Sequence, residues 1–166
     1  VVSALSEVST VKGRVELVPC DKDFSIVIDY AHTPDSLKKV LLTLKNFEHN
    51  RIITVFGCGG DRNRPRALMG ETAGKFADFT IITSDNPRSE DPESIVKDIE
   101  KGIIPTGADY ICIVDRREAI EYAIKNARAG DVIILAGKGH ETEQIFADRT
   151  VHFDEREIVR EILRGM

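Results

Sequence analysis

Five stretches of the chain consist almost entirely of apolar residues, and each has the length of a buried strand. They cover residues 25–30, 51–57, 79–84, 110–115 and 131–137. Between them, apolar residues recur at steps of three and four, which is the spacing of an amphipathic helix. Buried strands that alternate with helices predict a Rossmann-like, doubly wound α/β fold, in which helices cover both faces of a mostly parallel sheet.

The two ends of the chain depart from this alternation. Residues 144–153 alternate around a central Asp-Arg pair, which predicts a C-terminal hairpin, and residues 155–163 have the spacing of a closing helix. The charges of DEREIVRE (154–161) are expected on the solvent face of that helix. Residues 1–12 match none of the later units, so we expect a linker or the tail of a preceding domain there, and one domain over residues 13–166.

Composition narrows the class of protein. The 166 residues are 42% apolar and 31% charged, and the net charge of −5 argues against a partner that is a nucleic acid or an anionic membrane surface. No apolar run approaches the roughly 20 residues of a membrane helix. Three cysteines without C-x-x-C spacing favour a reduced, cytoplasmic protein. Cys112 lies in an apolar run and is expected to be buried.

Polar segments rich in glycine or proline follow four of the predicted strands. They are DYAHTPD (29–35), GCGGDRNRPR (57–66), SDNPRSEDP (84–92) and GKGHE (137–141). Parallel strands have their carboxyl ends at one edge of the sheet, where ligands bind in this class of fold. We therefore expect the four segments to form one site. None of them matches a G-x-G-x-x-G or P-loop motif.

Three of these segments also have simpler interpretations. GCGGDR can be a tight strand-to-helix turn in which glycine supplies a positive φ, although Arg62, Arg64 and Arg66 would then gather at a helix N-terminus suited to anions. His32 and His140 can be ordinary hydrogen-bonding loop residues. No two histidines have the spacing of metal ligands.

The segment DNPR (85–88) combines charges of both signs at the end of a buried strand. A solvated turn explains Asn86 and Pro87, but it does not explain carboxylates beside an arginine. Asp85 could bind an ammonium group, and Arg88 could bind a carboxylate through its bidentate guanidinium. The pattern favours a zwitterionic ligand.

Together, the motifs resemble the C-terminal domain of the Mur ligases, the ATP-dependent enzymes that build the stem peptide of peptidoglycan. GRVE, DYAHTPD, FGCGGDRNRPR, DNPR and AGKGHE occur in family order over about residues 13–166. Within the family, DNPR is typical of members that add meso-diaminopimelate rather than lysine. Residues 1–12 would then be a linker or the end of the family's central, ATP-binding domain.

The resemblance implies two groups of ligand-binding residues. Those expected to bind meso-diaminopimelate are Arg62, Asp85, Asn86, Pro87, Arg88, Gly137 and Glu141. Those expected to contact ATP are Arg14, Asp29, Tyr30 and His32. In the first group, the two arginines would hold carboxylate, while the glutamate and nearby backbone carbonyls would hold ammonium.

The resemblance also implies the reaction. Family members form an acyl phosphate from ATP and the D-Glu side chain of UDP-MurNAc-L-Ala-D-Glu, and the amine of diaminopimelate then forms the amide, while Mg²⁺ offsets phosphate charge. The P-loop, the metal ligands, a modified lysine and the UDP-binding domain belong to parts of the family that this sequence does not contain. We expect a monomer with no catalytic residue and no metal site of its own, inactive alone, with ATP and Mg²⁺ binding in the full-length enzyme.

Two other interpretations remain open. A lysine-adding Mur ligase or a folylpolyglutamate synthetase would share the fold, although DNPR and GKGHE argue against both. A signalling receiver or nucleotide-binding module would use Asp29, Asp85 and Lys138. A receiver, however, needs an acidic pair after its first strand and a phosphoacceptor aspartate after its third. Phosphorylation by acetyl phosphate would distinguish it.

Overall fold

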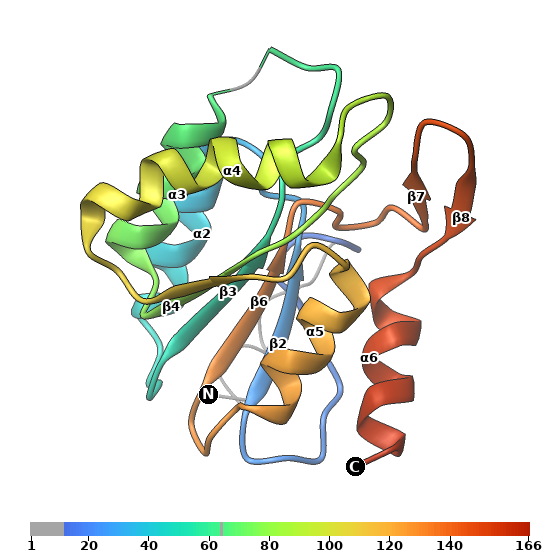
Figure 1. Cartoon of the computed structure of the whole chain (residues 1–166). Coiled ribbons are helices and arrows are strands. Elements are labelled where there is room, and N and C mark those ends of the chain that lie inside the picture. The colour runs from blue at the N-terminus through green and yellow to red at the C-terminus, as the bar shows by residue number, and fades with distance from the viewer. Residues whose placement is uncertain (1–11, 64) are drawn as a thin grey trace.

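A six-stranded sheet with helices on both faces organises the domain (Figure 1). The computed structural model describes residues 12–63 and 65–166. The strand order is β1-β2-β6-β3-β4-β5, and all neighbouring strands are parallel except β1 and β2. The predicted doubly wound α/β fold is confirmed. The predicted linker at residues 1–12 lies, apart from its last residue, outside the described residues.

The strands of the sheet follow the predicted apolar runs, with one addition. They are β1 (Glu16–Val18), β2 (Ser25–Asp29), β3 (Ile52–Phe56), β4 (Phe79–Ile82), β5 (Tyr110–Cys112) and β6 (Val132–Ala136). Every residue of β2, β3 and β6 is buried, which is why these sequences lack polar alternation. The prediction that Cys112 is buried is wrong, because β5 is an edge strand and leaves it exposed.

The helices divide between the two faces of the sheet (Figure 1). One face carries α2 (Pro34–Lys45), α3 (Arg66–Phe76) and α4 (Pro92–Ile103), and the other carries α5 (Arg116–Lys125) and α6 (Glu155–Arg164). A short 3₁₀ helix, η1 (Ile104–Thr106), follows α4. Thr33, Asp91, Asp115 and Asp154 cap the N-termini of α2, α4, α5 and α6. Each cap fixes the residue at which the preceding loop ends and the helix begins.

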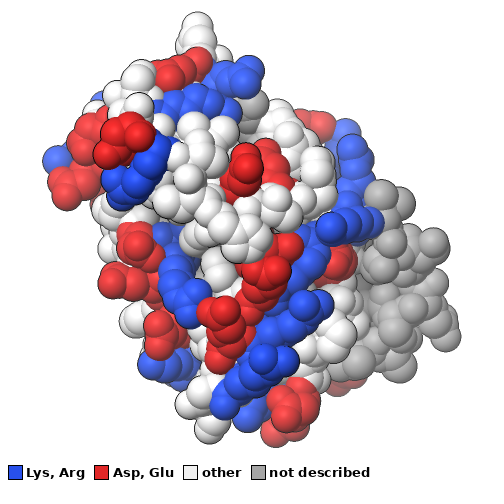
Figure 2. Space-filling view, turned by 90° about the vertical axis from the view of Figure 1, so that its right-hand side faces the viewer, with Lys and Arg blue, Asp and Glu red and all other residues white. Residues whose placement is uncertain are grey.

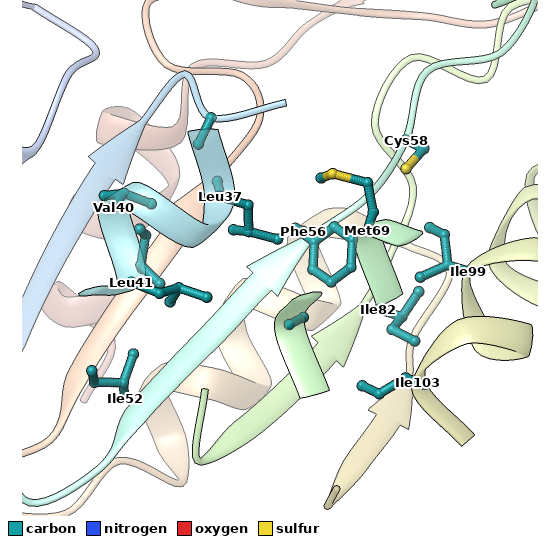
Figure 3. Packing of buried hydrophobic residues seen from close by; sticks show 14 of the residues in the cluster. Leu37, Val40, Leu41, Ile52, Phe56, Cys58, Met69, Ile82, Ile99 and Ile103 are labelled. Carbon is teal, nitrogen blue, oxygen red and sulfur yellow. The ribbon is translucent and has the colours of Figure 1, made fainter. Parts of the chain in front are cut away.

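Phe56 is at the centre of the core on the first face. Leu37 of α2, Met69 of α3 and Ile82 of β4 surround its ring (Figure 3). The helices α3 and α4 pack so closely that a Cβ on Gly102 would lie 1.6 Å from the carbonyl oxygen of Ala67. Because α3 and α4 each follow one of the polar segments, this rigid packing holds both segments in place.

The predicted C-terminal hairpin consists of β7 (Glu143–Ile145) and β8 (Thr150–His152). It stands beside the main sheet (Figure 1), and the backbone N–H of Arg88 joins the two by donating to the carbonyl of Ile145 at 3.0 Å. None of the helices in the described part of the chain is long and apolar enough to cross a membrane.

Candidate functional site

The four polar segments meet at the edge of the sheet where the parallel strands end, as predicted. The Gly60 N–H donates to the carbonyl of Asn86 at 2.9 Å, and the Gly137 N–H donates to the carbonyl of Asp29 at 3.0 Å. The side-chain amide of Asn86 donates to Glu141 Oε2 at 3.0 Å. Residues far apart in the sequence are therefore joined into one rim.

Asn86 is the hub of the part of the rim expected to bind the amino acid. The side chain is buried, and its Oδ1 accepts from Lys138 Nζ and from the backbone N–H of Ile145, each at 3.1 Å. Its Nδ2 meanwhile donates to Glu141. Because one end of the side chain must accept and the other must donate, an amide is required at this position.

Lys138 was not among the residues predicted to bind ligand, yet its side chain is fully buried here. Its Nζ lies 3.6 Å from Asp85 Oδ1 and 3.5 Å from Glu141 Oε2, and 5.7 Å from the centre of the Phe153 ring. A buried ammonium requires paired charges around it. Its place between two glycines, immediately after a buried strand, was the signal available in the sequence.

Arg88 has an unusual backbone that turns its side chain toward the glycine-rich segment. Its φ is +53°, and its Nη1 donates to the carbonyl of Gly60 at 3.0 Å. A Cβ on Gly60 would lie 1.8 Å from the carbonyl oxygen of Pro87. The adjacent glycines therefore allow the backbone of this segment to lie close to the backbone of the DNPR turn. The idea that they supply a positive φ is wrong, because Asp61 has that conformation instead (φ +54°).

Arg62 is separate from the other residues expected to bind diaminopimelate. Its exposed side chain lines a hollow of about 1050 Å³ beside α3 and α4. The Arg66 guanidinium is held by Glu90 at 2.7 Å and Asp98 at 3.2 Å, and its hydrogen bond lowers the pKa of Glu90. Arg66 is therefore engaged in a structural network rather than held ready for an anion. Arg64 lies outside the described residues.

The residues expected to contact ATP line a single hollow of about 390 Å³. They are Arg14, Asp29, Tyr30 and His32. The carboxylate of Asp29 accepts from the backbone N–H groups of Val15 at 2.8 Å and Ala31 at 2.7 Å, so it joins the two segments that form the hollow. The Tyr30 ring lies 4.5 Å from the ring of His32 and 5.1 Å from that of His140, measured between centroids.

Backbone strain gathers in these loops. In the described part of the chain, the residues other than glycine with positive φ are Val15 (+44°), Asp61 (+54°) and Arg88 (+53°). This conformation is costly for most side chains, and above all for a β-branched valine. Strained backbone is typical of ligand-binding and catalytic loops, and here it occurs in the loops that the motifs single out.

The chemistry of the 390 Å³ hollow suits a nucleotide. Its lining includes the cations of Arg14 and Lys39, of which Lys39 pairs with Asp35 at 2.7 Å, and the rings of Tyr30 and His32. Cations and rings are the kinds of group that bind phosphates and bases. Over residues 12–63 and 65–166, no group of three or more histidine, cysteine, aspartate or glutamate side chains is arranged to hold a metal ion.

Comparison with known proteins defines the class to which this fold and site belong. The sequence model of the family "Mur ligase, glutamate ligase domain" matches residues 13–139. The chain belongs to this family and corresponds to the C-terminal domain of its members, which are ATP-dependent, ADP-forming ligases. The predicted resemblance is confirmed.

Individual relatives are more specific. The UDP-N-acetylmuramoyl-L-alanyl-D-glutamate–2,6-diaminopimelate ligase of Caldanaerobacter subterraneus subsp. tengcongensis is 60% identical over 161 residues, which are 96% of this chain and 33% of the relative. A solved structure with the same enzyme name is 44% identical, with a TM-score of 0.87, and the match covers 96% of this chain and 33% of that one. This chain therefore spans about a third of the length of these relatives.

A more distant solved structure shares the fold alone. It is a bifunctional folylpolyglutamate synthase/dihydrofolate synthase from Yersinia pestis, complexed with AMPPNP and a Mn ion. It is 17% identical, with a TM-score of 0.61, and the match covers 81% of this chain and 30% of that one. The family match leaves no support for the alternative of a signalling receiver.

Proposed function

We propose that this chain is the amino-acid-binding domain of a longer, ATP-dependent ligase that joins meso-diaminopimelate to the D-Glu of UDP-MurNAc-L-Ala-D-Glu. The observation that carries the proposal is the network in which the buried side chains of Asp85, Asn86 and Lys138 meet the partly exposed Glu141, beside Arg88. It joins the DNPR turn to the GKGHE loop and brings charges of both signs together, which supports the proposal of a zwitterionic ligand.

In the proposed complex, the ligand's charged groups are divided among the rim residues. Arg88 holds a carboxylate, while Glu141, Asp85 and the backbone carbonyls near Gly137 hold an ammonium group. Arg62 holds the other carboxylate, for which its exposed side chain has to turn toward the DNPR turn. Pro87 fixes the bend that directs Arg88.

Selection of diaminopimelate over lysine follows from the carboxylate that lysine lacks. If lysine occupied the site, the arginine that faces this carboxylate would be left without its partner. A charged group left unpaired in this way costs about 1–3 kcal/mol or more. A site built to bond a polar group rejects a ligand without that group more strongly than a site that reads size alone.

The hollow around Arg14, Asp29, Tyr30 and His32 would close over ATP that is bound mainly by a preceding domain. Arg14 would contact phosphate, Tyr30 and His32 would pack against the nucleotide, and Asp29 would keep the two segments together. When ATP is bound, Mg²⁺ supplies charge neutralisation at the phosphates. We further propose that residues 1–12 connect the two domains, and that the enzyme acts as a monomer in the cytoplasm, where ATP is available.

An NMR titration of the chain with meso-diaminopimelate, L-lysine and ATP tests this function. Diaminopimelate should shift the amides of Arg62, residues 85–88 and Glu141, and lysine should not. Arg88→Ala should abolish these shifts, whereas Arg149→Ala, at the exposed tip of the hairpin, should leave them unchanged. Equal shifts with lysine, or binding that survives in Arg88→Ala, would contradict the proposed selectivity.

A further inference from the structure

A buried ion pair lies beneath the rim, outside the residues that the proposed function uses. Arg116 begins α5 and Glu155 begins α6, and the side chains of both are 0% exposed. Arg116 Nε donates to Glu155 Oε1 at 2.8 Å. Glu155 Oε2 is also buried and has no hydrogen-bond partner.

The rest of the Arg116 guanidinium reaches two strand ends. Nη2 donates to the carbonyl of Ala136 at 3.0 Å, and Nη1 makes a longer contact, 3.4 Å, to the carbonyl of Ser84. Ala136 immediately precedes Gly137, and Ser84 immediately precedes Asp85. One planar group therefore touches the roots of both loops that form the proposed amino-acid site.

Stability alone does not explain this pair. Removing two charges from water costs several kcal/mol per ion, and apolar residues of similar volume often replace a buried pair with no loss of stability. The two helices already share an apolar cluster that includes Ile120, Ile124 and Val159. The contribution that an apolar replacement could not provide is the pair of hydrogen bonds to the two strand ends.

We propose that Arg116 and Glu155 are positioning residues for the site, resting on the amino-acid-binding function proposed above. The guanidinium sets the distance between the DNPR turn and the GKGHE loop, because its planar fork fixes where both carbonyls lie. Glu155 fixes the orientation of that fork. Neither residue touches ligand, and their effect passes through the backbone of Ser84 and Ala136.

A neighbouring ion pair provides a matched control. Arg117 donates to Glu161 at 2.8 Å and also joins α5 to α6, but its side chain is 49% exposed and that of Glu161 is 56% exposed. Charges of both signs are interspersed over the face of the molecule seen in Figure 2. The same residue types on the same two helices thus occur once with contacts to the strand ends and once in solvent.

The test compares the wild-type chain with the double variant R116M/E155L, the single variant R116K and the control R117M/E161L. Denaturation midpoints measure stability. Amide hydrogen exchange at Gly60 and Ile145, whose N–H groups both bond to Asn86, measures the position of the DNPR turn without ligand. Titration with meso-diaminopimelate measures binding.

We expect R116M/E155L to keep the wild-type midpoint or exceed it, while exchange at the two amides and the Kd for diaminopimelate each rise about tenfold or more. R116K keeps the charge but cannot span both carbonyls. Its Kd for diaminopimelate should therefore lie between that of the wild-type chain and that of R116M/E155L. The control should match wild type in all three measurements.

Wild-type exchange and wild-type affinity in R116M/E155L would overturn the positioning role. A general loss of protection together with a lower midpoint would also overturn it, because the pair would then be merely structural. If the wild-type chain does not bind diaminopimelate, but exchange at Gly60 and Ile145 still rises selectively in the double variant, the positioning role stands and the proposed function fails.

Discussion

The two halves of the rim carry the predicted binding residues in different ways. Around Asn86, side chains bond to one another, and the ammonium of Lys138 is completely buried among them. Around Asp29, the carboxylate bonds to backbone N–H groups, and Arg14 is exposed to solvent. The first half is a network of charged and polar side chains, and the second is a backbone scaffold that carries side chains such as the exposed Arg14 on its surface.

This difference separates two ways of preparing a surface for a ligand. A buried network fixes its polar groups before the ligand arrives, so little ordering remains to be done on binding. Exposed side chains on a fixed backbone are able to adjust when a second surface approaches. In the proposed function, the half around Asn86 would select the amino acid, and the half around Asp29 would close over ATP held by another domain.

The largest expected effect comes from removing the buried charge. Lys138→Met leaves the carboxylates of Asp85 and Glu141 facing each other without the ammonium, and should lower the free energy of unfolding by about 3 kcal/mol. Arg14→Met, in the other half, should change it by no more than about 0.5 kcal/mol. Urea denaturation of both variants measures the two values. Similar losses in both would contradict the contrast drawn between the halves.

A smaller effect is expected from adding one methyl group. Gly60→Ala should cost about 1–3 kcal/mol, because its Cβ overlaps the carbonyl oxygen of Pro87 and pushes the DNPR turn away. The amide chemical-shift changes caused by diaminopimelate should become smaller in this variant, while those caused by ATP should persist. In the control Gly107→Ala, the Cβ meets open space, and only the positive φ should cost about 1 kcal/mol. Equal loss of both ligands in Gly60→Ala would show that the halves are not independent.

The smallest effect is a dependence of stability on pH in the half around Asp29. Arg156 bonds to Glu16 at 2.8 Å and lowers the pKa of this carboxyl below its ordinary value of 4.5. A carboxyl whose pKa is lower in the folded chain than in the unfolded chain stabilises the fold at pH values above its unfolded-state pKa. This stabilisation is lost as the pH falls through the folded-state pKa. From about pH 5 to about pH 3, the wild-type chain should lose more stability than Glu16→Gln. If the free energy of unfolding changed equally with pH in the two proteins, Glu16 would not be the cause of the pH dependence.

The sequence allowed most of the fold to be predicted, because long apolar runs mark strands that are covered on both faces. β1 was not predicted, since three residues at an antiparallel edge are too few for a pattern. The prediction that the charges of DEREIVRE all face solvent was wrong for Glu155 and Arg156, which are buried. Their partners, Arg116 and Glu16, lie 39 and 140 residues away in the sequence, and a local pattern cannot reveal such pairs.

The candidate site was predictable to a different extent. Its location followed from the rule that ligands bind beyond the ends of parallel strands, and the motifs identified the loops. The roles of the individual residues remain predictions. The sequence also did not show that Lys138 is buried, because burial of a charge depends on partners that only the folded chain brings together. Likewise, Arg116 and Arg117 are adjacent and chemically identical, and only the packing of α5 against the sheet distinguishes them.

The hairpin provides a position from which ligand binding at the site can be monitored. Its first strand bonds to the DNPR turn through Ile145 and Arg88, whereas its tip at Asp148 and Arg149 lies in solvent. Movement of the turn would therefore reach a part of the molecule that touches no proposed ligand. A fluorophore or spin label at Asp148 would therefore report the arrival of an amino acid from outside the site, and extra residues could be inserted at the tip without disturbing the sheet.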